Sequence, residues 1–283
     1  MRACVPNLAA PFPAALLMGE TVDVQREGGI ARVVMHRKGI NAIAGDLVSE
    51  LVSAFEALGK DPELRVIVLA SEYEKYFSVG ADLGEMAGID RGATDAAEQI
   101  YTFARSGQRA FDTLAAVPKP VIAAINGHAL GGGCELALTC DYRIMVEDGR
   151  SKIGQSESAL GIIPGAGGTQ RLVRLIGKAR AYPMLLESRR LSAKEAEAVG
   201  LVDRAVPPEE FAVAVDELAQ RLAKAPTVAL AMIKDAVNRG MDLPLDEAQE
   251  IEARNFAHAS LSEDAVTGVV AFLQKTEPEF KGR

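Results

Sequence analysis

The sequence predicts an α/β fold followed by a helical C-terminal region. In the first two thirds of the chain, short runs rich in valine and isoleucine alternate with longer segments of helical periodicity. After Lys178 the strand signals nearly stop, and helical periodicity continues to the end. The 283 residues are 48% hydrophobic and 25% charged, an ordinary globular balance that excludes a disordered chain, a collagen-like chain and a coiled coil.

Four apolar runs bounded by Gly, Asp or Asn are predicted strands, at residues 30–36, 65–71, 120–126 and 142–146. Two helices are predicted between them, at 46–58 and 94–114. The apolar face predicted for the second helix consists of Ile100, Phe103, Ala104, Phe111 and Leu114. Five further helices are predicted at 179–186, 193–199, 208–224, 227–240 and 244–259.

The charge, hydropathy and cysteine content of the chain argue against several kinds of partner and site. Lys and Arg total 31 and Asp and Glu total 39, a net charge of −8 that argues against nucleic-acid binding. No apolar run is long enough to span a membrane. The three cysteines form no disulfide framework and show no metal-ligand spacing with the three histidines. We therefore expect a cytoplasmic protein without a metal site, a nucleic-acid partner or a membrane anchor.

The first 18 residues are predicted to be a poorly defined leader. Residues 8–18 are apolar and rich in small residues, but the preceding basic region is thin and no clear cleavage site follows. We expect the folded domain to begin near Met18.

One glycine-rich segment follows a predicted strand and opens a helix: Gly127-His-Ala-Leu-Gly-Gly-Gly-Cys-Glu135. Adjacent glycines let a backbone approach a ligand closely, and a helix start offers free N–H groups to an anion or a developing oxyanion. Taken alone, such a segment is more typical of a tight strand-to-helix turn. No Gly-Lys-Ser or Gly-Lys-Thr follows, so it is not a P-loop.

Two other segments are also rich in glycine. Phe77-Ser-Val-Gly-Ala-Asp-Leu83 follows a strand and offers a further free N–H at Ala81, and five glycines between 154 and 168 predict a loop. Glu135 in a first helical turn is explained by the helix dipole alone, and Glu157 by a solvated loop. Spacing by itself assigns neither glutamate a function.

Together these segments resemble the enoyl-CoA hydratase/isomerase (crotonase) superfamily. The resemblance runs from about Thr21 to the C-terminus and includes the segments at 77–83, 126–137, 154–157 and 163–172, with Ala-Lys-Glu-Ala at 193–196 and Gly-Leu-Val at 200–202. It implies a spiral core of ββα turns with a C-terminal helical trimerisation region. The implied division is a leader at 1–18, a core carrying the active site at 19–206, and an oligomerisation region at 207–283.

The resemblance also implies the site residues. The N–H groups of Ala81 and Gly132 would form an oxyanion hole for the carbonyl of an acyl-CoA thioester. Coenzyme A and substrate would lie against the family's binding positions, which are Val79, Ala81, Asp82, Leu83, Gly132 and Gly165. Coenzyme A is then part of the substrate, and neither a metal nor another cofactor is expected.

The implied catalytic acids are Glu135 and Glu157. The hydratases of this family carry two glutamates at these positions, where one deprotonates the attacking water and the other manages the proton at Cα. We therefore expect an enoyl-CoA hydratase that converts a 2-enoyl-CoA to a 3-hydroxyacyl-CoA. The alternatives are an enoyl-CoA isomerase or another thioester enzyme of this fold, and a non-catalytic acyl-CoA-binding or RNA-binding relative.

The sequence departs from the family pattern at four places. Ser156 replaces the usual proline, about two extra residues lie at 147–150, Gly84 replaces a common lysine, and His36-Arg37-Lys38 replaces Asn-Arg-Pro. These changes affect the expected coenzyme A contacts more than the expected chemistry. The helical end of the chain further implies a homotrimer or hexamer.

Overall fold

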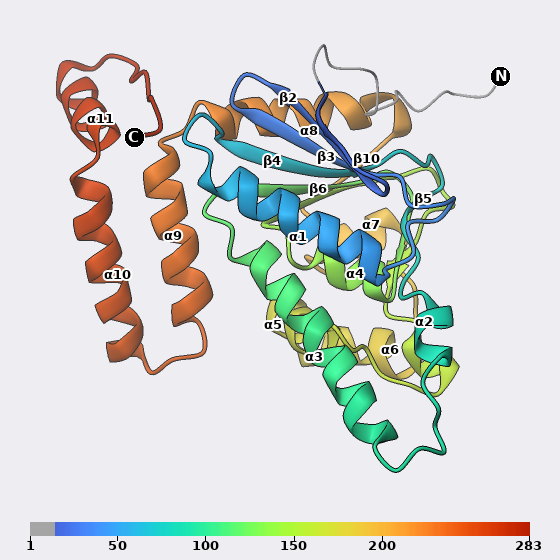
Figure 1. Ribbon diagram of the computed structural model, residues 1–283. Helices are drawn as coiled ribbons and strands as arrows, with labels where there is room; N and C mark the ends of the chain where they lie inside the picture. Colours follow the sequence, from blue (N-terminus) through green and yellow to red (C-terminus); the bar gives the residue numbers. More distant parts are fainter. Residues whose placement is uncertain (1–14) are drawn as a thin grey trace.

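The larger of two β-sheets forms the centre of the molecule (Figure 1). The computed structural model describes residues 15–283. The order of its seven strands is β1-β2-β3-β4-β6-β8-β10. They are β1 (Ala15–Met18), β2 (Val22–Glu27), β3 (Ile30–Met35), β4 (Val66–Ser71), β6 (Val121–Ile125), β8 (Tyr142–Val146) and β10 (Arg204–Val206). The first three strands pair antiparallel, and from β3 to β10 the pairing is parallel.

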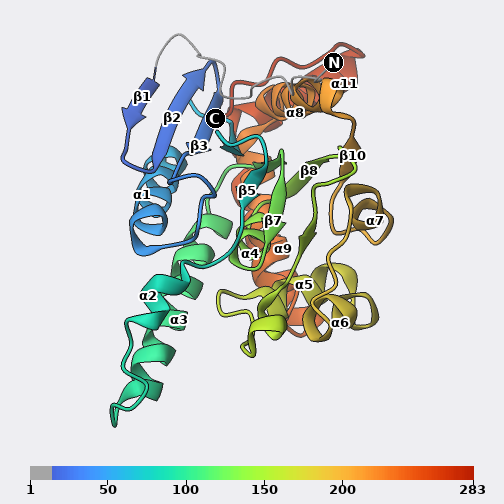
Figure 2. The same ribbon diagram turned by 90° about the vertical axis from the view of Figure 1, so that its right-hand side faces the viewer.

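A second, smaller sheet consists of β5 (Tyr76–Ser78), β7 (His128–Leu130) and β9 (Ile153–Gly154), all parallel. Each of these strands follows one strand of the large sheet and precedes a helix. β5 and β7 are seen side by side in Figure 2. The repeated strand–strand–helix unit is the predicted ββα spiral.

The helices cover both faces of the large sheet and extend beyond it. They are α1 (Gly45–Lys60), α2 (Leu83–Ala87), α3 (Ala96–Ala115), α4 (Gly132–Ala137), the 3₁₀ helix η1 (Glu157–Leu160), α5 (Gly168–Ile176), α6 (Lys178–Leu186), α7 (Ala193–Ala198), α8 (Pro208–Ala223), α9 (Thr227–Gly240), α10 (Leu245–Ser260) and α11 (Glu263–Gln274). In Figure 1, α1 and α4 lie on one side of the sheet and α8 on the other.

Strand β4 shows how the sheet divides two hydrophobic cores. All six of its residues are buried, as expected of a central parallel strand. Ile67 and Leu69 belong to the core under α1 and α4, whereas Val68 belongs to the core under α8 together with Phe211. The alternation follows the two-residue period of a strand.

The predicted strands and helices are present, with ends shifted by a few residues. The helix expected to open at the glycine-rich segment is α4, and the structure adds β1, β2, the small sheet, β10, α2, α5 and α11. Residues 1–14 of the predicted leader lie outside the described residues, but β1 pairs with β2, so the sheet begins ahead of residue 19. In residues 15–283, no helix combines the length and apolarity needed to cross a bilayer.

The apolar face predicted for α3 is wrong in its first half. Phe111 and Leu114 are buried, but Ile100 and Phe103 are each 40% exposed. The first turns of α3 extend beyond the sheet, so that no core lies beneath them (Figure 1).

Helix α9 meets the core at a partly buried ion pair and at Leu230, which packs against the core under α8. Lys234 of α9 contacts the Asp141 carboxylate at 2.7 Å and donates to the Lys119 carbonyl at 3.1 Å. Helix α10 packs along α9 and buries none of its own residues completely. The predicted boundary at 207 precedes α8, yet α8 packs on the sheet, so α9–α11 are the helices that leave it.

Replacing Phe211 should destabilise the protein strongly. Phe211 has no exposed surface and fills the core between α8 and the sheet. Phe211→Ala should lower the free energy of unfolding by about 3–5 kcal/mol, because it removes apolar contacts and leaves a cavity. Val213→Ala on the same helix is the control, since Val213 is 57% exposed and should cost less than about 0.5 kcal/mol. Urea unfolding at one fixed protein concentration compares them, and equal losses would contradict this account.

Candidate active site

The glycine turn between β7 and α4 brings the start of a helix against the small sheet. Gly131 has a φ of 54°, which glycine adopts without strain, and it directly precedes α4. A Cβ on Gly133 would lie 2.1 Å from the Ser78 carbonyl oxygen of β5, so the close approach excludes any side chain there. The sequence Gly-Gly-Gly is thus needed for packing as well as for exposing backbone.

Two backbone N–H groups meet at this turn. A Cβ on Gly132 would lie 3.3 Å from the Ala81 nitrogen. The Ala81 segment is held from both sides by Ile43, which donates to the Gly80 carbonyl at 2.7 Å and accepts from Asp82 N–H at 2.8 Å. Within residues 15–283, neither the Ala81 nor the Gly132 N–H donates a hydrogen bond. Both remain available for one shared acceptor.

Glu135 lies in the first turn of α4 and is only 3% exposed. Its Oε1 accepts hydrogen bonds from Ala166 N–H at 2.8 Å and from Gly168 N–H at 2.7 Å. No donor from the described part of the chain contacts Oε2. One carboxylate oxygen is therefore fixed, and the other is left for a small polar molecule such as water.

Glu157 opens the 3₁₀ helix η1, and its carboxylate turns towards the glycine turn. A Cβ on Gly131 would lie 2.9 Å from the Glu157 Oε1. With its amide nitrogen turned towards Glu157, Gln155 donates to both carboxylate oxygens at 3.2 and 3.3 Å. The segment Glu147–Arg150, where two extra residues were expected, forms a partly exposed turn after β8.

Burial controls the electrostatics of both acids. It raises the pKa of Glu135 to about 7, with a further rise from the negative charge of Glu157 and opposing effects from Gly168 N–H, Ala166 N–H and Arg171. Burial also raises the pKa of Glu157, which is more exposed. The two carboxyl groups therefore lie close enough to interact, and Glu135 is poised to exchange a proton near neutral pH.

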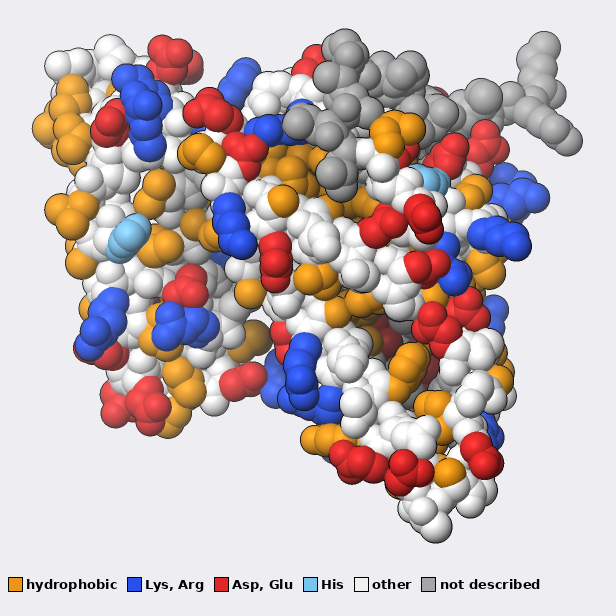
Figure 3. All heavy atoms as spheres, in the orientation of Figure 1, with side chains coloured by type: hydrophobic (Ala, Val, Ile, Leu, Met, Phe, Trp, Pro, Cys, Tyr) orange, Lys and Arg blue, Asp and Glu red, His pale blue; other side chains and the backbone are white. Residues whose placement is uncertain are grey.

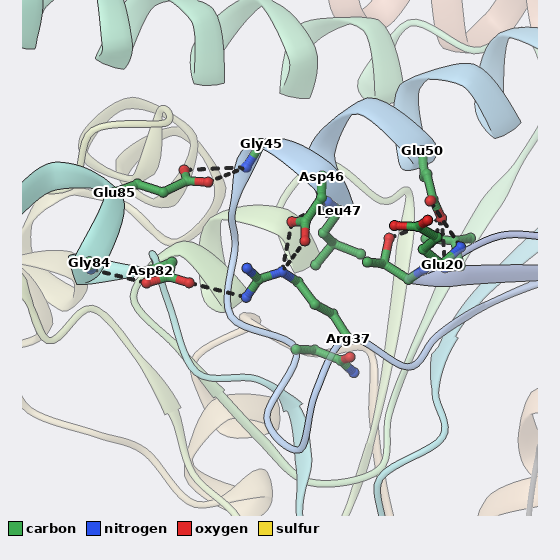
Figure 4. Close-up of polar contacts among 12 residues, drawn as sticks. Glu20, Arg37, Gly45, Asp46, Leu47, Glu50, Asp82, Gly84 and Glu85 are labelled. Atoms are coloured by element: carbon green, nitrogen blue, oxygen red, sulfur yellow. Dashed lines mark hydrogen bonds and ion pairs between the residues drawn. The ribbon is translucent and has the colours of Figure 1, made fainter. Parts of the chain in front are cut away.

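Arg37, Asp46 and Asp82 form an arginine clamp. It joins the oxyanion segment, which is the chain around Ala81, to the start of α1 (Figure 4). Arg37 Nε donates to both Asp46 oxygens at 2.7 and 2.9 Å, and its Nη1 contacts Asp82 at 3.2 Å. Beside it, the Glu85 carboxylate accepts from Gly45 N–H at 3.0 Å. These contacts hold Asp82, which directly precedes α2, and Glu85 within α2 against the start of α1, and no sequence pattern had indicated them.

An open cleft of about 730 Å³ borders this clamp. The cleft is lined by Glu20, Thr21, Arg37, Lys38, Ile40, Ala42, Asp46, Val79, Ala81, Asp82 and Leu83. The lining includes four of the six positions expected to bind coenzyme A. Gly132 lies at the adjoining turn. Gly165 is elsewhere: its carbonyl accepts from Gln108 at 2.9 Å, in the loop that binds Glu135.

Two other reactive side chains near the turn have packing roles. Burial lowers the pKa of His128, whose Nδ1 accepts from Lys152 N–H at 3.1 Å. Cys134 is fully buried, and burial raises the pKa of its thiol. Among the described residues, no group of three or more His, Cys, Asp or Glu side chains has an arrangement that could hold a metal ion.

Comparison with known proteins agrees with this geometry. The family model for enoyl-CoA hydratase/isomerase matches residues 25–283. A crotonyl-CoA hydratase of Syntrophomonas wolfei is 38% identical over 262 residues, which cover 92% of this chain and 98% of that protein. A short-chain-enoyl-CoA hydratase of Clostridium acetobutylicum is 37% identical, covering 93% and 98%.

A solved structure shares the fold. The crystal structure of an enoyl-CoA hydratase from Bacillus anthracis superposes with a TM-score of 0.85 at 34% identity, covering 93% of this chain and all of that one. This match confirms the predicted crotonase fold. The chain therefore belongs to the enoyl-CoA hydratase/isomerase family.

Proposed function

We propose that this protein is an enoyl-CoA hydratase, which adds water across the 2,3 double bond of a 2-enoyl-CoA to give a 3-hydroxyacyl-CoA. The observation that carries the proposal is the meeting of two carboxylates and two unused backbone N–H groups at the Gly131 turn. Relatives at 37–38% identity that are named hydratases support the same reaction.

The Ala81 and Gly132 N–H groups bind the thioester carbonyl oxygen. When hydroxide adds to Cβ, negative charge moves to this oxygen as the enolate forms. Fixed donors stabilise that charge without reorganising, and each is worth roughly 10²–10³-fold in rate at comparable oxyanion sites. Backbone donors need no side chain, which accounts for the alanine and glycines of the two segments.

The two glutamates divide the proton transfers. The Oε2 of Glu135 holds the water and accepts its proton, because the two N–H groups on Oε1 favour the ionised carboxylate. Glu157, whose carboxyl group lies against Gly131, helps to hold the water and in its protonated form delivers a proton to Cα. The proton that Glu135 accepted then passes to Glu157, which restores both groups for the next turnover. One hydroxide and one proton are added, so neither an oxidant nor a reductant is required.

Coenzyme A is supplied by the substrate and occupies the cleft beside the Arg37 clamp. Two carboxylates already neutralise Arg37, so Lys38 is the lining cation best placed to meet a phosphate group of coenzyme A. A lysine here offsets the absence of one at Gly84. The names of the relatives favour crotonyl-CoA as the first substrate to test, and a cytoplasmic location remains a prediction.

The C-terminal helices are proposed to assemble a homotrimer or hexamer, as the region 207–283 was expected to do. Large apolar side chains are exposed along them, at Ile233, Val237, Met241, Leu245, Phe256, Val266, Val269, Phe272 and Leu273. Figure 3 shows hydrophobic side chains along the outer edge formed by α10 and α11. Such a surface is large for a monomer and is typical of subunit contacts.

Replacing either glutamate should slow hydration strongly. Glu135→Gln and Glu157→Gln each keep the side-chain size but remove proton exchange, so kcat for crotonyl-CoA should fall at least ~10²-fold with little change in KM. The double variant should fall far short of the product of the two effects, because both groups act on one water. Glu217→Gln, exposed on α8, is the matched control.

An isomerase would respond differently to the same variants. One glutamate would matter greatly and the other little, and a 3-enoyl-CoA would be the better substrate. A wild-type protein that hydrates no 2-enoyl-CoA of any chain length, or a Glu157→Gln variant with near wild-type hydration, would overturn the proposed function.

Glu135 should make the fold less stable at high pH. Its pKa rises from the ordinary 4.5 to about 7 in the folded protein, so the stability present below pH 4.5 is lost as pH rises through 7. By pH 8 the loss is about 3 kcal/mol. Glu135→Gln has no carboxyl group to ionise and should not show this loss. The free energy of unfolding of the variant, relative to that of the wild type, should therefore increase between pH 5 and pH 8. Urea titrations that show a pH-independent difference would contradict the buried charge.

Sedimentation should show a trimer or hexamer of the 30.0 kDa chain at micromolar concentration. Val269→Asp on α11 should weaken the assembly, because it would bury a charge in the proposed contact. Val213→Asp, equally exposed on α8, should leave the mass unchanged. A wild-type monomer under these conditions would count against the proposed assembly.

A further inference from the structure

The loop that binds Glu135 is itself held by two side chains from outside it. Gln108 of α3 donates its Nε2–H to the Gly165 carbonyl at 2.9 Å. Arg171, one turn into α5, donates from Nη1 to the Ala166 carbonyl at 2.8 Å. Nothing in the proposed reaction uses either side chain.

The geometry of the peptide bond links these contacts to Glu135. In a trans peptide the C=O and N–H groups point in opposite directions. Gln108 holds the Gly165 carbonyl, so it aims the Ala166 N–H of the same peptide at Glu135 Oε1. The Arg171 side chain holds the Ala166 carbonyl, which belongs to the peptide between the two peptides whose N–H groups bind Oε1. The Gly167 carbonyl accepts from the backbone N–H of Arg171 at 2.8 Å, which fixes the peptide that carries Gly168 N–H.

The guanidinium of Arg171 is built into the loop. A Cβ on Gly167 would lie 2.3 Å from Nη1, so the guanidinium lies directly against the glycine, whose φ is 110°. Its Nη2 pairs with Asp112 of α3, one turn after Gln108. The Arg171 side chain is 21% exposed, so most of its surface lies against the protein.

We propose that Gln108 and Arg171 are positioning residues for Glu135: they hold the 165–168 loop so that both N–H groups bind Oε1 and Oε2 remains free for water. This inference rests on the proposed function. Neither residue touches the reacting atoms. They act by keeping the donors aligned, and Arg171 adds a positive charge that favours the ionised carboxylate.

Other charged and titratable groups near Glu135 also influence the stability of its ionised form. Among the described residues these are Glu157 from η1, which disfavours the ionised form, and the buried Cys134 thiol next to it. Asp112 is exposed and is paired with Arg171. Arg171 is thus the cation that offsets the repulsion between the two acids, in addition to the two N–H groups.

The test compares Arg171→Gln, Arg171→Lys and Gln108→Met. The lower limb of the pH profile of kcat/KM should move to higher pH by ~0.5–1 unit in Arg171→Gln, because a positive charge near the acid is lost. Arg171→Lys keeps the charge and should largely restore the limb. Gln108→Met should move it in the same direction by misaligning Ala166 N–H. Arg174→Gln, on the same helix with an exposed ion pair to Asp242, is the control and should leave it unchanged.

A second readout needs no activity. Infrared difference spectroscopy can titrate the Glu135 carboxyl band, identified by its loss in Glu135→Gln. The band should titrate at higher pH in Arg171→Gln and Gln108→Met than in the wild type. If neither variant shifts the titration, or if Arg174→Gln shifts it as far, the positioning role is wrong. If the titration shifts but no 2-enoyl-CoA is hydrated by the wild type, the positioning role stands and the proposed function fails.

Discussion

The burial of one carboxylate determines much of the site. Glu135 is almost fully enclosed, and an ionised group there is costly unless hydrogen bonds compensate for the lost water. Two N–H groups converge on one of its oxygens, which requires the chain at 165–168 to turn tightly. That turn is possible because Gly167 adopts a positive φ and Gly168 lies against Gln155 and Pro164, where a side chain would collide. Gly167 and Gly168, which are distant from Glu135 in the sequence, thus allow the hydrogen bonds that stabilise its charge.

The small sheet is the second requirement, because it brings three distant segments to one point. β5, β7 and β9 each lead directly into a functional segment: the oxyanion segment, the glycine turn and the Glu157 segment. Their pairing places Gly133 against Ser78 and Gly131 against the Glu157 carboxylate. Short strands are sufficient here, since the large sheet and its two cores supply the stability.

The sequence predicted most of the long elements, although it missed β2, α5 and α11, and it missed most of the short strands. β8 and α9 have enough residues for a hydrophobic period to appear, whereas β9 has two residues and β5 three, too few for any period. Burial on α3 depended on where the sheet ends, which no local pattern contains. Glu135 and Glu157 were found through a resemblance, because spacing alone could not distinguish them from a dipole partner and a loop residue. No sequence pattern indicated a role for Gln108, because its hydrogen-bond partner is a carbonyl 57 positions away.

The division between backbone and side-chain groups explains how one fold serves several reactions. In the proposed reaction, activation of the thioester depends on the Ala81 and Gly132 N–H groups, which any sequence preserving the turns retains. The carboxylates can change without disturbing these donors, so loss of one acid alters the fate of the enolate and leaves its formation possible. The contacts that α3 and α5 make with the loop around Glu135 are a further influence, because we infer that they adjust the basicity of this acid from outside the substrate pocket. In the proposed mechanism, side chains therefore decide between hydration and other enolate chemistry, and the main chain performs the step that these reactions share.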